Sequence, residues 1–225
     1  MKEKNRKIEE ILIVGTVLLL LSLMLISLDA LLPSSFQKIT GGVITTVNVT
    51  QANPINCSLT LASGLNLVSF FCISNSVPVS QVVGGLSNLE AVFEYQEGST
   101  DPWKIYNPNL PGFVIQDLQS MSRTEGYWII MSSDENLSLQ GMLRVPTFIN
   151  LATGWNLVGY PTNEIKPANE SFATIDGNFT EVRTYLPSVG SFISYVPGVG
   201  GALNQTEPNL GYWINATVSE VWVVD

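Results

Sequence analysis

The tetrapeptide GYWI stands at residues 126–129 and again at residues 211–214. Its surroundings return in the same order, at an offset that shrinks from 90 to 85 residues: LASGLNLVSF (61–70) with LATGWNLVGY (151–160), WKIYNP (103–108) with FISYVP (192–197), and EGYWII (125–130) with LGYWIN (210–215). Ordered matches of this kind indicate an internal tandem repeat whose second copy has shorter loops. We place the units at residues 56–144 and 145–225.

Each unit is predicted to consist mainly of short strands. Runs such as LEAVFEYQ, WKIYN and GYWIIMS are rich in β-branched and aromatic residues and are bounded by turn-forming residues. A short helix is expected to begin near Pro78 and Ser80, and IQDLQSM (115–121) favours a second helical turn. The predicted fold class is mainly β with a minor α contribution: an N-terminal transmembrane helix followed by two tandem homologous small β-rich domains.

The N-terminal segment predicts a membrane anchor. Residues 1–10 are basic and polar, and the 18 residues from Ile11 to Leu28 carry no charge, which is long enough to cross a bilayer. We assign residues 11–32 to a transmembrane signal-anchor helix and residues 33–55 to a stalk or linker. Because the basic residues precede the span, the positive-inside rule predicts a cytoplasmic N-terminus and an external C-terminal domain. A cleaved secretory signal is the alternative.

Composition argues against several classes of function. The chain of 225 residues has a net charge of −9 and contains no His. Beyond residue 32 there are 6 basic and 15 acidic residues, so this part repels phosphate backbones and no nucleic-acid partner is expected. Without His, the commonest general base and the commonest zinc ligand are missing. We therefore expect no enzyme activity, no cofactor and no metal site.

The two cysteines, Cys57 and Cys72, flank the turn ASG in what is predicted as a hairpin. Their counterparts at an offset of 90 residues are Thr147 and Thr162, so both positions change together. A paired change of this kind predicts a cross-strand disulfide, which would contribute about 3 kcal/mol by loop closure. Two free buried thiols are the alternative.

Asn-X-Ser/Thr sequons lie in the part of the chain that is predicted to be external. They are candidate glycosylation sites, at Asn48, Asn56, Asn136, Asn169, Asn178, Asn204 and Asn215. A sequon is only an acceptor, and its use depends on the host.

The aromatic residues around the repeated tetrapeptide have two interpretations. In a strand, Tyr127 and Ile129 point to one face and Trp128 to the other, and burial of Trp128 in the core would explain the repeat. The alternative is an aromatic face that binds sugars or peptides, formed by side chains from both units: Trp103, Tyr106, Tyr127, Phe192, Tyr195 and Tyr212.

The pattern L-x-x-G-W-N-L-V-x-Y-P, followed by W-x-x-Y-x-P and GYWI, resembles a module found in secreted and cell-surface proteins of archaea and bacteria, often in tandem. The resemblance covers nearly all of residues 56–225. The first copy departs from the pattern at Leu65, where Trp is usual, and at Phe71, where Pro is usual; the second copy keeps Trp155 and Pro161. The resemblance implies a surface location and a tandem architecture, and it brings no known active site.

These features predict a single-pass plasma-membrane protein with a non-catalytic structural or adhesion-type recognition domain outside the cell. The expected partners are membrane lipid, through residues 11–32, and other envelope proteins or glycans. One alternative is a pilin-like filament or motor subunit that uses the N-terminal helix for assembly, with cleavage at Gly15. A second alternative is an envelope hydrolase that uses carboxylates.

Overall fold

The computed structural model describes residues 35–40, 43–48 and 54–225, so the predicted membrane span at residues 11–32 lies outside the described residues. Within the described part of the chain, no helix is both long enough and apolar enough to cross a membrane.

The chain divides into two compact units, Met1–Ala52 and Asn53–Asp225. The first unit contains an antiparallel hairpin, in which β1 (Ser35–Thr40) pairs with β2 (Val43–Asn48). The second unit contains the repeated sequence and consists of two modules, which we define by their strands.

The first module spans residues 55–141. Its elements are β3 (Ile55–Leu61), β4 (Gly64–Val68), β5 (Asn75–Pro78), α2 (Val79–Val83), β6 (Leu89–Tyr95), β7 (Trp103–Tyr106), β8 (Ser120–Ser122), β9 (Tyr127–Met131) and β10 (Glu135–Gly141). The second module spans residues 147–224. Its elements are β11 (Thr147–Leu151), β12 (Gly154–Val158), β13 (Lys166–Pro167), α3 (Ala168–Ser171), the 3-10 helix η1 (Ala173–Ile175), β14 (Phe179–Leu186), β15 (Ser191–Tyr195), β16 (Gln205–Thr206), β17 (Tyr212–Ala216) and β18 (Glu220–Val224).

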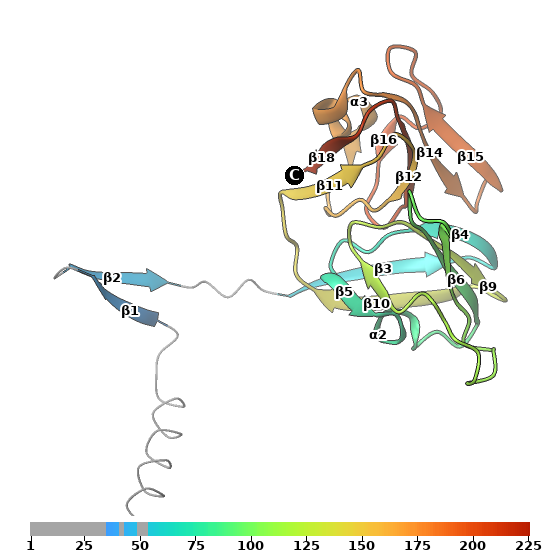
Figure 1. The fold of residues 1–225 in the computed structure, drawn as a ribbon, viewed down its shortest axis with the longest axis horizontal. Coiled ribbons are helices and arrows are strands. Elements are labelled where there is room, and N and C mark those ends of the chain that lie inside the picture. The colour runs from blue at the N-terminus through green and yellow to red at the C-terminus, as the bar shows by residue number, and fades with distance from the viewer. Residues whose placement is uncertain (1–34, 41–42, 49–53) are drawn as a thin grey trace, which may run out of the picture. The chain divides into compact units, whose positions relative to one another are not determined.

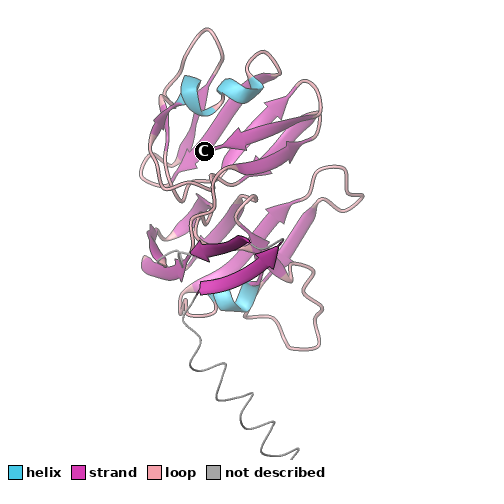
Figure 2. Cartoon of the chain, turned by 90° about the vertical axis from the view of Figure 1, so that its left-hand side faces the viewer, coloured by secondary structure: helices cyan, strands magenta, loops and turns pink. Residues whose placement is uncertain are grey.

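The two modules have the same strand pairing. The first contains a four-stranded sheet in the order β4-β9-β6-β7, a ladder of β10 with β3, and a short pair of β5 with β8. The second repeats this arrangement as β12-β17-β14-β15, β11 with β18, and β13 with β16. Strands dominate both modules, and the short helices α2 and α3 lie at opposite ends of the unit (Figures 1 and 2). The prediction of a mainly β fold is confirmed.

The short helix predicted near Pro78 is present as α2. Its residues Val79, Val82 and Val83 are buried, and the helix stops at Gly84. A five-residue helix has little stability of its own, so its buried valines hold it in place through contacts with the core.

Two local predictions are wrong. The ASG turn does not close a hairpin, because β3 pairs with β10 and β4 pairs with β9. The segment IQDLQSM contains no helix and runs into strand β8. Its polar side chains serve β7 instead: the backbone N–H groups of Ile105 and Asn107 donate to Asp117 and Gln116, at 2.7 and 2.8 Å. These bonds occupy the outer edge of the four-stranded sheet and so protect it from further strand pairing.

The corner between the first two strands of each module is held by an Asn side chain. Asn66 accepts a hydrogen bond from the Ala62 N–H at 2.8 Å and donates to the Ala62 carbonyl at 2.7 Å. Asn156 makes the same pair of bonds in the second module, at 2.9 and 2.8 Å. The glycine two positions earlier has a positive φ, +87° at Gly64 and +103° at Gly154, which a Cβ atom disfavours. The repeated G-x-N sequence therefore encodes this corner.

Each module encloses its own hydrophobic core. Phe70, Met121 and Ile129 are fully buried in the first core, and Phe172 and Trp222 are almost fully buried in the second. Large side chains of this kind contribute about 1.5–3 kcal/mol each on burial. A third, smaller cluster of Leu67, Leu157 and Trp213 joins the two modules.

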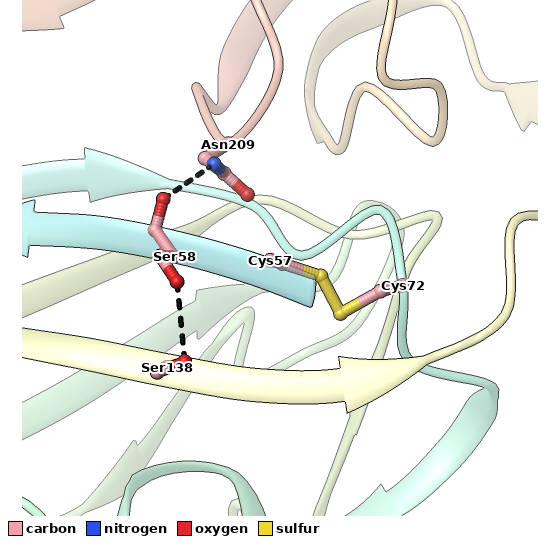
Figure 3. The surroundings of a disulfide bond; sticks show 5 residues. All are labelled: Cys57, Ser58, Cys72, Ser138 and Asn209. Atoms are coloured by element: carbon pink, nitrogen blue, oxygen red, sulfur yellow. Dashed lines mark hydrogen bonds between the residues drawn. A yellow bond between two sulfur atoms is a disulfide. The ribbon is translucent and has the colours of Figure 1, made fainter. Parts of the chain in front are cut away.

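The predicted disulfide between Cys57 and Cys72 is present, with the Cα atoms 6.1 Å apart (Figure 3). It does not cross a hairpin. Cys57 lies in β3, and Cys72 lies in the loop after β4, so the bond ties the β3–β10 ladder to a segment that leaves the four-stranded sheet. Beside it, the Ser58 hydroxyl hydrogen-bonds Ser138 at 3.1 Å, and Asn209 of the second module donates to the Ser58 carbonyl at 3.3 Å.

The disulfide can be tested by giving the first module the threonine pair of the second. We expect Cys57→Thr with Cys72→Thr to lower the free energy of unfolding by about 3 kcal/mol, because the unfolded chain regains the closed loop's freedom. Urea unfolding measures the change. Reductant should destabilise the parent and leave the double variant unaffected; equal stability of the parent and the variant would contradict this account.

Candidate functional site: the outer faces of the two sheets

The tyrosines of the repeated tetrapeptide point into the cores. Tyr127 and Tyr212 are both 0% exposed. The phenol oxygen of Tyr127 accepts a hydrogen bond from the Ser122 N–H at 2.6 Å, and that of Tyr212 accepts one from the Glu207 N–H at 2.8 Å. Neither ring is accessible to a ligand, so their assignment to an aromatic binding face is wrong.

The tryptophans lie on the opposite face of each sheet, because side chains alternate along a strand. Trp128 packs against Tyr185 and Phe192 of the second module, with ring centroids 5.4 and 5.9 Å apart. The interpretation that Trp128 fills the core of its own module is therefore also wrong. It packs instead in a cluster at the boundary, with Leu67 of its own module and Leu157 and Trp213 of the other.

Trp213 makes the reciprocal contact. It packs against Tyr95 and Trp103 of the first module, with ring centroids 5.1 and 6.1 Å apart. By strand position, Trp213 corresponds to Trp128, Tyr95 to Tyr185, and Trp103 to Phe192. Each copy of the tetrapeptide thus places its tryptophan on the aromatic face of the other copy.

The glycine of the tetrapeptide permits this close approach. A Cβ atom on Gly126 would lie 2.8 Å from the Val158 carbonyl oxygen, and one on Gly211 would lie 2.9 Å from the Val68 carbonyl oxygen. Backbone hydrogen bonds cross the boundary in two matching pairs. The N–H groups of Gly126 and Gly211 donate to the carbonyls of Leu157 and Leu67, at 3.4 and 3.3 Å. The N–H groups of Gly159 and Ser69 donate to the carbonyls of Thr124 and Asn209, both at 2.9 Å. The modules are therefore joined by backbone bonds as well as by ring contacts.

Ser69 adds an unsymmetrical tie at this boundary. It is fully buried, and its hydroxyl donates to the Leu210 carbonyl at 2.7 Å while accepting from the Tyr160 N–H at 3.1 Å. The corresponding position of the second module is Gly159, which has no side chain to contribute. Removing this hydroxyl would leave the Leu210 carbonyl and the Tyr160 N–H buried without a hydrogen-bond partner, which would destabilise the boundary.

The remaining residues of the predicted aromatic face divide between the two sides of the sheets. Trp103 and Phe192 are each 42% exposed on the outer faces. Tyr106 and Tyr195 pack partly buried against the two cores. The predicted residues therefore do not form one surface.

An open apolar groove, which the sequence analysis missed, lies on the outer face of the first module. It has a volume of about 430 Å³ and is lined by Leu65, Phe93, Trp103, Trp128 and Ile130. The alternation within LEAVFEYQ could have revealed Phe93, because Val92 and Phe93 must face opposite sides of the sheet.

The same face of the second module is covered by an arginine. The guanidinium carbon of Arg183 lies 4.1 Å from the centre of the Trp155 ring and 4.8 Å from that of Phe192. Such stacking is a favourable cation–π contact. Arg183 stands at the strand position of Phe93, and Trp155 at that of Leu65.

A polar cleft of about 620 Å³ lies between the modules. Its lining includes the carboxylates Glu94, Glu97 and Glu125 from the first module, and the amides Asn150 and Asn156 from the second. Among the residues that the structure describes, no cluster of three or more His, Cys, Asp or Glu side chains is placed to hold a metal ion.

Burial perturbs two of the cleft's carboxyls. It raises the pKa of Glu125 to about 7, with a further contribution from the charge of Glu94 and opposition from the Thr124 hydroxyl at 3.2 Å. Burial also raises the pKa of Glu94, against the opposing hydrogen bond from Gln96 and the charge of Lys104. Glu125 therefore exchanges its proton near neutral pH.

The candidate glycosylation sites differ in accessibility. Within residues 54–225 the exposed acceptors are Asn56, Asn136, Asn169 and Asn204, and the half-buried ones are Asn178 and Asn215. The amide nitrogen of Asn178 donates to Glu220 at 2.6 Å, a bond that glycosylation would disturb. Asn48 ends strand β2.

In comparisons with known proteins, no family model matches the chain, and neither a curated protein nor a solved structure matches it. Inference about function therefore depends on the chemistry of the surfaces described above.

The reciprocal tryptophan contact predicts that the modules unfold together. The substitution Trp213→Ala removes the ring that contacts both modules. We expect it to lower the free energy of unfolding by about 3 kcal/mol and to split urea unfolding into two transitions. Circular dichroism at two wavelengths and proteolysis within residues 142–146 measure the uncoupling. Phe113→Ala, at an 87% exposed position, is the control and should change neither. One transition with an unchanged midpoint would refute the coupling.

Glu125 predicts a pH dependence of stability. Its folded-state pKa of about 7 lies above the ordinary value of 4.5. Below about pH 4.5 the carboxyl is protonated in both states and does not lower the stability of the fold. As the pH rises from there through 7, ionising the buried carboxyl lowers the free energy of unfolding. We expect Glu125→Gln to match the parent at pH 4 and to exceed it at pH 8 by up to about 3 kcal/mol. Urea unfolding across this range measures the difference.

Glu164→Gln, at an exposed carboxylate, is the control for that series. It measures what the loss of one surface carboxylate does to stability at each pH, and the Glu125→Gln difference is compared with it. A Glu125→Gln difference that stays constant from pH 4 to pH 8 would show that burial does not shift this carboxyl.

Proposed function

We propose that the chain is a single-pass membrane-anchored protein of the cell surface, whose two modules form a non-catalytic recognition domain. The observation that carries this proposal is the construction of the second unit. Two modules of equal topology are held together by reciprocal aromatic contacts, and one of them leaves an apolar groove open on its outer face. In this proposal the modules arose by tandem duplication, and residues 56–144 and 145–225 are homologous domains.

Several observations support an external location. The disulfide between Cys57 and Cys72 is typical of an oxidising compartment. Exposed sequon side chains suit a glycosylated surface. The basic start and the uncharged run from Ile11 to Leu28 suit an anchor with a cytoplasmic N-terminus and the plasma membrane as its location.

Intact-protein mass spectrometry tests the proposal on material purified from native membranes, with and without reduction and deglycosylation. We expect a chain that still contains residues 11–32, that gains two hydrogens on reduction and that loses mass on deglycosylation. A chain that begins after Gly15 would instead favour a filament subunit assembled through its N-terminal helix. A chain that begins in the 30s would indicate a secreted protein and overturn the anchor.

The polar cleft favours one second candidate, an envelope hydrolase. Glu125, with its pKa near 7, could donate a proton there while Glu94 accepts one. The test is Glu125→Gln and Glu94→Gln in assays on wall glycans and peptides. Activity that both changes abolish would establish the hydrolase, and turnover unaffected by either change would eliminate it.

A further inference from the structure

The groove of the first module draws on every strand of its sheet. Leu65 comes from β4, Phe93 from β6, Trp103 from β7, and Trp128 and Ile130 from β9. Leu65 is 45% exposed and Trp103 is 42% exposed. Contiguous exposed apolar side chains on a sheet face are unfavourable in water, and in soluble proteins they commonly mark a binding surface.

The fold itself does not require a fully apolar face here. The second module keeps the aromatic residues Trp155, Phe192 and Trp213 at the positions of Leu65, Trp103 and Trp128, but it carries polar side chains at four other positions of the same face. The register of the strands gives the corresponding positions directly: Ala91 with Glu181, Phe93 with Arg183, Ile105 with Ser194, and Ile130 with Asn215. A sheet face turned to water normally carries polar side chains, and the second module follows this rule at these four positions. The first module departs from this rule at each of these positions.

The lining of the groove selects the chemistry of its occupant. The indole N–H groups of Trp103 and Trp128 are the only polar side-chain atoms among the five lining residues. A sugar needs several hydrogen-bond partners, and this lining does not supply them. A large apolar side chain of a protein needs only the hydrophobic contact.

The boundary between the modules shows how this face receives such a side chain. Trp213 already rests against Tyr95 and Trp103, and Trp103 also lines the groove. Trp128 likewise belongs to both the boundary and the groove. The groove is therefore continuous with an interface in which an aromatic side chain is bound.

Charge indicates what flanks the apolar anchor. Residues 56–144 contain three basic and eight acidic residues, and Glu97 lies in the turn that leads into Trp103. Asp101 lies in the same turn and is paired with Lys104 at 4.0 Å. A cationic segment complements this surface, and cations are also attracted to tryptophan rings. A second copy of this chain, with a net charge of −9, would be repelled.

We propose that the groove formed by Leu65, Phe93, Trp103, Trp128 and Ile130 binds an extended cationic segment of a partner protein, which inserts one large apolar side chain. This inference rests on the proposed recognition function and names the partner's chemistry. The segment's basic side chains complement the net negative charge of the first module, and its anchor lies against the two indole rings.

The test uses the full chain in detergent and three dye-labelled heptapeptides. One has a central tryptophan flanked by lysine and arginine, one has the same tryptophan flanked by glutamate, and one has the basic flanks around a central serine. Fluorescence anisotropy measures binding. We expect the basic tryptophan peptide to bind at least roughly tenfold more tightly than either of the others.

A matched variant closes the groove with residues that the same sheet already accommodates. Leu65→Trp with Phe93→Arg copies the second module, so it should fold, with an unchanged circular dichroism spectrum, and it should weaken binding of the basic tryptophan peptide roughly tenfold or more. Phe113→Ser removes an 87% exposed apolar side chain elsewhere in the first module and should leave binding unchanged.

The proposal fails if the three peptides bind equally, or if the groove-closing variant binds as the parent does. It also fails if sedimentation shows self-association that this variant abolishes, which would identify a second copy as the occupant. Binding of a chitin oligosaccharide in place of the peptide would make the groove a glycan site. Mass spectrometry of the anchor is independent of these outcomes, so the inference and the proposed function can fail separately.

Discussion

The reciprocal seating of Trp128 and Trp213 is the contact on which the arrangement of the second unit depends. Each ring crosses to the aromatic pair of the other module, and the glycine that precedes it brings the two backbones within hydrogen-bonding distance. The tetrapeptide GYWI therefore serves two purposes. Its tyrosine and isoleucine complete a module's core, while its glycine and tryptophan build the contact between modules.

The sequence predicted the β-rich class, α2 and the pairing of Cys57 with Cys72, because each leaves a local signal in composition, spacing or repetition. It could not predict which face Trp128 occupies. Three consecutive apolar residues satisfy either phase of a strand, and only the second module decides between them. The partners of β3 and β4 were equally out of reach, because the ASG turn shows where the chain bends, whereas pairing depends on the distant strands β9 and β10.

The two modules reach a stable core by different means. In the first module, the disulfide links the β3–β10 ladder to the loop after β4. The second module has the buried residues Thr147 and Thr162 at the two corresponding positions. The second module also has Trp222 at the ladder position that Leu137 holds in the first, and the indole N–H of Trp222 donates to the Ser171 carbonyl at 2.8 Å. The module without a disulfide therefore has the larger aromatic side chain in its core at this position.

The position of the disulfide has a mechanical consequence. In a protein tethered through its N-terminal side, tension on the groove would run through β4 and β3 toward the tether, and Cys57 and Cys72 lie on that route. The bond makes the 15-residue separation between them inextensible, so a load cannot lengthen the chain there. The second module lies beyond the groove in sequence and off this route, and it is the module that lacks the covalent bond.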